Sequence, residues 1–327
     1  MGTCRCMAAA LAVTGLALLN PLNPAIAQEV CPSRTIKIVV PNPAGGIGDI
    51  LTRILGERAA VELERTVVID NITGATTTIG TNVVAKSKPD GCTILSLTTS
   101  GVVATLLMEK LPYDLWRDFA PIINVGSLPM ALAVPAGSKI NTMADLVGVA
   151  RSKDGITYGS GGNGTMAHLS AARLIKDVGG SSNHIPYRGN APAIQALLAN
   201  QIQLFFPSTA EALPLVKAGK IRLLGVTSDE RFPAFPDTPS MKEAGFPEFN
   251  PRLWFAFLAP SATPGEIVSK LHNALSRSVT DPAVQGRLGA MGFSAELKNP
   301  AGLAAYMKSE ATRWGKVIVD NNIKADD

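Results

Sequence analysis

From about residue 36 the chain alternates short apolar runs of strand character with segments of helical character. The first three runs lie at residues 36–40, 67–70 and 93–97, and a helix-like segment follows each of them. Such a β-α-β-α-β series predicts a parallel sheet with helices on both faces. Aromatic residues make up only 5% of the chain, which also favours closely packed α/β layers over an aromatic-rich sandwich.

A second strand-and-helix series begins after residue 125, and a chain of 327 residues is long for a single core. An apolar run at 253–258 and the helical remainder are expected to return to the first sheet. We therefore predict an α/β protein with two domains, each a central sheet flanked by helices. The first domain comprises 28–124 together with 252–327, and the second comprises 125–251.

The first 27 residues have the features of a signal peptide. Arg5 supplies a positive charge, and the apolar run at 7–19 is too short to cross a bilayer. Ala25-Ile26-Ala27 is an A-x-A cleavage site, so we expect cleavage after Ala27 and export to the periplasm. The alternative interpretation is an uncleaved membrane anchor.

Two cysteines remain once the signal segment is removed, Cys31 and Cys92. Each lies just before a predicted strand, and neighbouring parallel strands begin at the same edge of a sheet. Because the periplasm is oxidising, we predict a disulfide between them. Two free thiols are the alternative.

Several function classes fit the sequence poorly. The 30 basic and 26 acidic residues are dispersed, so the chain has no basic run that would track nucleic acid. The three histidines are far apart, and neither a nucleophile motif nor metal-ligand spacing is present. Residues 159–164 match G-x-G-x-x-G, but the acidic residue expected about 20 positions later is absent. We predict no enzyme activity, no cofactor and no metal.

Glycine-rich loops at 41–49 and 159–165 each connect a strand to a helix, where free backbone N–H groups can bind an anion. Other loops also follow predicted strands, and loops at the carboxyl ends of strands converge on one cleft. Plain turns, a packed His168 and a solvated Arg188 are the alternatives. The candidate ligand-binding residues are Asn42, Pro43, Ala44, Gly45, Gly46, Asp49, Thr77, Thr78, Thr99, Ser100, Asn163, Gly164, Thr165, His168 and Arg188.

Ordered motifs give the chain a resemblance to a known family. They include Pro-x-Pro-Ala-Gly-Gly-x-x-Asp at 41–49, Leu-Pro-Tyr-Asp at 111–114, Gly-Asn-Gly-Thr at 162–165 and Pro-Tyr-Arg-Gly at 186–189. With these, the sequence resembles the substrate-binding receptors of tripartite tricarboxylate transporters, the Bug receptors. The resemblance implies a two-lobed periplasmic-binding-protein fold (type II-like) that closes on a carboxylate. It also implies a large and a small membrane transporter subunit as partners, and we expect the receptor itself to be a monomer.

Departures from the family pattern bear on the ligand. Asn42 stands where a Phe is usual, and residues 76–78 are threonines in place of Gly-Gly-Asn. Pro207, followed by the candidate ligand residue Ser208, replaces the family's usual acidic residue. Without that carboxylate we expect a ligand that lacks a cationic amine, such as a di- or tricarboxylate or an aromatic acid. The alternative role is the ligand-sensing arm of a periplasmic signalling system.

Overall fold

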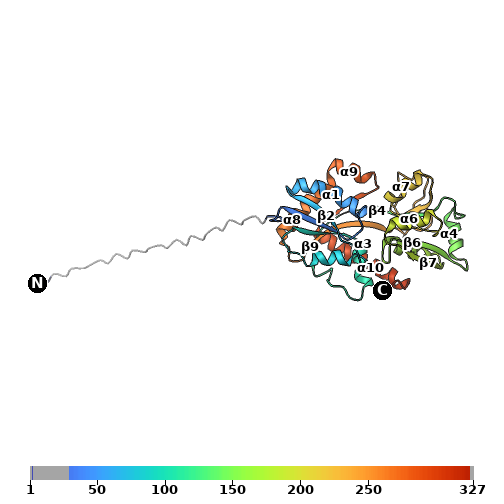
Figure 1. Cartoon of the computed structure of the whole chain (residues 1–327), viewed down its shortest axis with the longest axis horizontal. Coiled ribbons are helices and arrows are strands. Elements are labelled where there is room, and N and C mark those ends of the chain that lie inside the picture. The colour runs from blue at the N-terminus through green and yellow to red at the C-terminus, as the bar shows by residue number, and fades with distance from the viewer. Residues whose placement is uncertain (1, 3–28, 325–327) are drawn as a thin grey trace.

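The computed structural model describes Gly2 and residues 29–324. The expected signal segment, apart from Gly2, and its cleavage site after Ala27 lie outside this part. The chain forms two α/β lobes that lie side by side, and the final helix, α10, runs near their junction (Figure 1).

The first lobe is built on a six-stranded sheet with the order β10-β4-β9-β3-β1-β2. Strand β1 pairs in parallel with both β2 and β3, which confirms the parallel sheet expected from the alternating pattern. Strand β9 returns from the far part of the sequence and inserts antiparallel between β3 and β4. The bounds are β1 Thr35–Val40, β2 Thr66–Asn71, β3 Thr93–Thr98, β4 Phe119–Pro129, β9 Arg252–Pro260 and β10 Ser294–Lys298.

Six helices cover this sheet, with a separate apolar core on each face. Successive strand residues point to opposite faces, so Ile38 packs with α1 and α8, whereas Val39 packs with α2, α3 and α10. The C-terminal helices therefore dock on the first sheet, as the sequence predicted. The bounds are α1 Ile47–Leu63, α2 Thr78–Ala85, α3 Thr99–Leu107, α8 Gly265–Thr280, α9 Pro282–Gly289 and α10 Pro300–Asp320.

A disulfide joins the two segments that lead into β1 and β3. Cys31 and Cys92 lie just before β1 and β3, and their Cα atoms are 4.5 Å apart. Because β1 and β3 are adjacent parallel strands, their first residues meet at one edge of the sheet. The predicted bridge is confirmed.

The second lobe has its own sheet. Segment 203–207 joins two strand pairs, because Phe205 and Ala133 exchange both backbone hydrogen bonds while Gly159 donates to Leu204. The resulting order is β8, β5, segment 203–207, β6 and β7. The bounds are β5 Ala131–Pro135, β6 Ile156–Ser160, β7 Ser182–Pro186, β8 Ile221–Val226, α4 Met143–Ala150, α5 Met166–Asp177, α6 Asn190–Leu198 and α7 Thr209–Lys217.

The chain crosses between the lobes at two places, and α10 joins them at a third. Strands β4 and β9 stay paired up to Pro129 and Arg252, so the expected domain boundary at 124/125 falls inside β4. Helix α10 packs into both lobes, with Leu303 in the core of the first and Val317 in that of the second. Buried Glu310, between them, accepts hydrogen bonds from the indole N–H groups of two tryptophans, Trp254 at 3.0 Å and Trp314 at 2.9 Å.

Candidate functional site

A cavity of about 410 Å³ lies where loops of the two lobes meet. Apolar side chains form much of its wall, and backbone and short polar groups form the rest. Its lining residues are Asn42, Pro43, Ala44, Gly45, Gly46, Ile47, Gly48, Thr98, Ser100, Met130, Gly161, Thr165, Met166, Ala167, Arg188, Gly189, Asn190, Ala191, Pro192, Ile194, Ser208, Glu211, Leu253 and Phe255.

The N-termini of five helices border this cavity, because the N-cap residues of α1, α3, α5, α6 and α7 all line it. Helices α5 and α7 are capped by their own hydroxyl side chains, Thr165 and Ser208. Helices α1, α3 and α6 have no side-chain cap. Each uncapped end offers free N–H groups and the positive end of a helix dipole, worth about 0.3–1 kcal/mol to a bound anion. The cavity therefore favours negative charge.

The buried carboxylate of Asp49 stabilises the conformation of the first glycine loop. Gly45, at φ +77°, donates its backbone N–H to Asp49 Oδ2 at 2.9 Å. Arg53 and Asn71 bind the same carboxylate at 2.9–3.0 Å. Burial alone would raise the pKa of Asp49, but these hydrogen bonds together hold it below its ordinary value. With its carboxylate committed to the loop, Asp49 leaves the amides at the start of α1 to face the cavity.

The second glycine loop is closed by its own side chains. Thr165 Oγ1 donates to the carbonyl of Gly162 at 2.8 Å and accepts from His168 N at 3.4 Å. Gly164 adopts φ +73°, and a Cβ there would lie 2.6 Å from the Leu107 side chain of α3. The positive φ and this short distance both favour glycine where this loop of the second lobe packs against the first.

Two stacked imidazoles support the second loop from behind. His168 Nδ1 accepts a hydrogen bond from Gly164 N at 3.3 Å, and its ring stacks on His184 at a centroid distance of 3.8 Å. His184 Nε2 lies 2.7 Å from Ser160 Oγ, and the Tyr158 ring lies beside the pair, with centroid distances of 4.9 Å to His184 and 6.0 Å to His168. Burial lowers the pKa of His168 to about 3, with a contribution from His184, and lowers that of His184 to about 4. Both rings are therefore neutral at pH 7.

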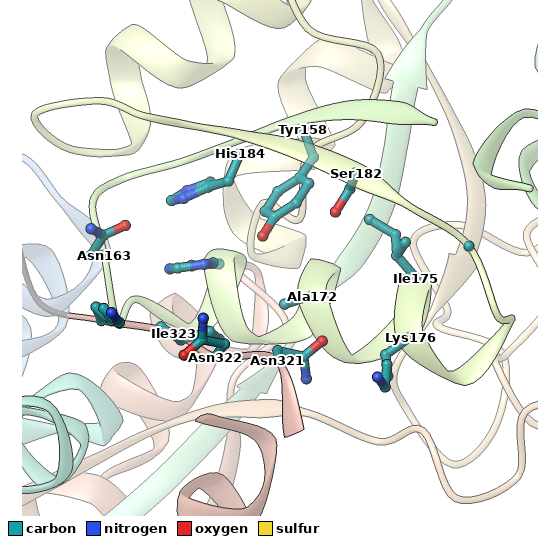
Figure 2. A pocket seen from close by; sticks show the side chains of 13 residues that line it. Tyr158, Asn163, Ala172, Ile175, Lys176, Ser182, His184, Asn321, Asn322 and Ile323 are labelled. Carbon is teal, nitrogen blue, oxygen red and sulfur yellow. The ribbon is translucent and has the colours of Figure 1, made fainter. Parts of the chain in front are cut away.

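His168 and Asn163 line a different cavity, of about 400 Å³, beside α5 (Figure 2). Tyr158 and His184 point into this second cavity from the strands above the helix. His168 thus supports the loop that borders the first cavity and does not line that cavity itself.

Arg188 supplies a positive side chain to the first cavity. It follows β7 and is exposed, and within residues 29–324 its guanidinium has no hydrogen-bond or ion-pair partner. The neighbouring Gly189 is the N-cap of α6, and a Cβ on it would lie 4.0 Å from Pro43 of the first loop. Arg188 is therefore placed beside the point where the loops of the two lobes approach each other.

The structure brings many of the predicted site residues to this cavity. Those that line it are Asn42, Pro43, Ala44, Gly45, Gly46, Ser100, Thr165, Arg188 and Ser208. Those that do not are Asp49, Thr77, Thr78, Thr99, Asn163, Gly164 and His168. Residues 75–77 all have positive φ, between 44° and 73°, and with this backbone path the side chains of Thr77 and Thr78 are buried. Thr99 is fully buried as the first residue of α3.

The other lining residues were not among the candidates, although Ile47, Gly48 and Gly161 lie in the two predicted glycine loops. Glu211 is the one of them that bears a charge. The N-terminal residues of α6 follow Arg188 directly, so the rule that identified Arg188 could also have found Asn190. Leu253 and Phe255 come from β9, and Met130 lies in the connection between β4 and β5. No local pattern distinguishes these three from ordinary core residues.

Residues 29–324 lack two kinds of feature. No three histidine, cysteine or acidic side chains lie close enough together there to bind a metal ion. In the same part of the chain no helix combines the length and apolar character needed to cross a membrane.

The family model "Tripartite tricarboxylate transporter family receptor" matches residues 51–323. The chain belongs to this family. Its members are substrate-binding receptors rather than enzymes. The resemblance inferred from the sequence motifs and the two-lobed fold are both confirmed.

Relatives match the receptor over nearly its whole length. The UPF0065 protein in the tcbD-tcbE intergenic region of Pseudomonas sp. (strain P51) is 35% identical, covering 96% of this chain and 95% of its own. The structure of periplasmic binding protein BugD superposes with a TM-score of 0.81 at 32% identity, over 90% of this chain and 100% of BugD.

Two similar structures hold ligands. MatC from Rhodopseudomonas palustris, solved with malate, has a TM-score of 0.80 at 29% identity, over 88% of this chain and 100% of MatC. Rpa4515 from R. palustris, solved with adipate, has a TM-score of 0.83 at 30% identity, over 90% of this chain and 99% of its own.

Proposed function

We propose that this receptor captures a small carboxylate, a di- or tricarboxylate or an aromatic acid, between its two lobes and delivers it to a tripartite membrane transporter. The observation that carries the proposal is the convergence on one cavity of three uncapped helix N-termini and of Arg188, whose guanidinium has no partner among residues 29–324. Malate and adipate, bound by two relatives, are both carboxylates, which supports this ligand class.

The two ends of the ligand would meet different groups. The amides at the start of α1 would take one carboxylate, because Gly46 gives that helix end no side-chain cap. Arg188 would take a second oxygen-bearing group through its planar fork of N–H donors. Ile47, Met166 and Phe255 line the space between and suit a hydrocarbon chain or an aromatic ring.

The proposal extends to the protein's location and assembly. Segment 1–27 would direct export and be removed after Ala27, which leaves a periplasmic monomer. Domain 1 would comprise 28–124 and 252–327, and domain 2 would comprise 125–251. Closure of these domains on the ligand would present a surface to the large and small membrane subunits.

A thermal-shift screen of carboxylates tests the binding proposal. A ligand at 100 times its Kd stabilises the form that binds it by about 2.7 kcal/mol, which raises the Tm by several degrees. We expect at least one di-, tri- or aromatic carboxylate to raise the Tm in this way, while matched amides and alcohols do not. A screen in which no carboxylate raises the Tm would overturn the proposed ligand class.

A further inference from the structure

The cavity contains one carboxylate that the binding of a simple anion does not require. Glu211, in the first turn of α7, lines the cavity and is half-buried there. Its Oε2 atom accepts hydrogen bonds from the backbone N–H and the hydroxyl of Ser208, both at 2.8 Å. Its Oε1 atom accepts from Asn190 Nδ2 at 2.9 Å. Three hydrogen bonds thus hold the carboxylate in one orientation.

These contacts leave Glu211 able to accept one more hydrogen bond. A carboxylate has about four acceptor positions and no proton to donate. Ser208 occupies both positions on Oε2, and Asn190 occupies one on Oε1. A ligand group that meets the remaining position has to be a donor, because a second carboxylate placed there would be repelled.

The second lobe therefore presents two different polar groups to the ligand. Arg188 can only donate hydrogen bonds, whereas Glu211 can only accept them. Of the described residues that line the cavity, these are the two that carry a charge. A ligand with only acceptor oxygens would satisfy Arg188 and leave Glu211 desolvated without a new partner.

We infer that Glu211 is a specificity residue that selects, among carboxylates, those that also carry a hydrogen-bond donor, either a hydroxyl or an ammonium group. This inference rests on the proposed function, since it concerns the same cavity. It also bears on the expectation from Pro207, because Glu211 supplies an anionic group to the cavity four positions further along the chain.

Calorimetry on sets of ligands that share a skeleton tests the inference. The sets are succinate, malate and aspartate, then glutarate, 2-hydroxyglutarate and glutamate, and finally benzoate and 3-hydroxybenzoate. In at least one set we expect a donor-bearing member to bind about 10-fold or more tightly than the donor-free member, the effect of one hydrogen bond to a charged group. Malate against aspartate then tells whether the donor is a hydroxyl or an ammonium.

Glu211→Gln tests whether this residue is the cause. Glutamine at this position can still form the reciprocal bonds with Ser208 that cap α7, so the fold is retained. The preference for the donor-bearing ligand should fall to within about 2-fold, because one acceptor oxygen becomes an N–H donor. Asp145→Asn is the matched control: Asp145 makes the same kind of capping box in α4, away from the cavity, and the preference should persist.

The outcomes distinguish a failure of the proposed function from a failure of the inference about Glu211. Failure of every carboxylate to bind overturns the proposed function and this inference together. Binding of carboxylates with equal affinity for both members of each set, or of donor-free carboxylates alone, overturns this inference only. A preference that survives Glu211→Gln overturns it as well.

Discussion

The two glycine loops occupy equivalent positions in their lobes, but only the second is followed by a helix whose N-terminus is capped by a side chain. Each connects a strand to a helix, the first before α1 and the second before α5. The first ends at Gly46, which has no side chain to cap α1. The second ends at Thr165, which caps α5 with its own hydroxyl. An anion can therefore use the backbone amides of the first loop far more readily than those of the second.

The side chains that support the two loops also differ, since one set is charged and the other neutral. Under the first loop lies a charged network in which Arg53 and Asn71 hold Asp49. Behind the second loop lie two neutral imidazoles, His168 and His184. The first loop is thus built to present amides to a ligand, and the second is built to stay closed while its lobe presents Arg188. Four experiments test this difference between the loops.

Acidification should destabilise the protein by protonating the two imidazoles that support the second loop, and this is the largest effect on stability that we expect. Both imidazoles have a folded-state pKa well below the ordinary value of 6.5, so the unfolded chain binds more protons between about pH 6.5 and 4. Stability is then fully present above pH 6.5 and is lost as the pH falls through that window. We expect the free energy of unfolding to drop by about 2–4 kcal/mol from pH 7 to pH 5, measured by urea denaturation.

His184→Gln removes one of the two titrating rings and is the matched test of this pH effect. The loss of stability between pH 7 and pH 5 should shrink by about half. An undiminished pH dependence in this variant would mean that the histidine pair is not its source.

A cap added to the first loop should abolish its advantage. Gly46→Asp would place a carboxylate on the free amides of α1. The φ of −73° at this residue is one that side chains adopt, and a Cβ 3.1 Å from the Pro43 carbonyl oxygen requires only a small shift of the loop. We expect ligand affinity to fall by about 100-fold or more, measured by calorimetry, with little change in stability. Gly137→Asp, at an exposed glycine with open space around it, is the control and should bind normally. Unchanged affinity in Gly46→Asp would place the anion elsewhere.

Removal of the positive side chain from the second lobe should have a smaller effect. Arg188→Ala deletes an exposed group with no partner among residues 29–324, so the apo Tm should stay within 1–2 °C, roughly the scatter of surface substitutions. Affinity should fall about 10-fold. Arg188→Lys should recover only part of it, because lysine lacks the planar fork. Full affinity in the alanine variant would remove Arg188 from the site.

Loss of the cap on the second loop should have the smallest effect on binding. Thr165→Ala removes the bond to the Gly162 carbonyl and the acceptor for His168 N, which should cost about 1 kcal/mol in the free energy of unfolding. Affinity should change only a few-fold, because α5 offers capped amides. Thr165→Ser should restore stability. A loss of affinity as large as that of Gly46→Asp would contradict the contrast between the loops.

Local pattern was enough to predict much of this molecule. The parallel direction of β1 and β3 and the candidate Cys31–Cys92 bridge follow from where the apolar runs begin, whereas the adjacency of the two strands is set by the strand order of the sheet. The positions of the two glycine loops follow from glycines placed between a strand and a helix. These features depend on residues close together in sequence, or on the parallel direction that a βαβ series gives its strands.

Tertiary packing decided the rest. Thr77 and Gly46 both lie in predicted loops, yet only Gly46 reaches the cavity, because the positive φ angles at 75–77 direct the threonine inward. Phe255 lines the cavity only because β9 inserts beside β3, and Glu211 only because α7 begins at the same edge as α6. Such placements depend on contacts between segments far apart in the chain, and no local periodicity records them.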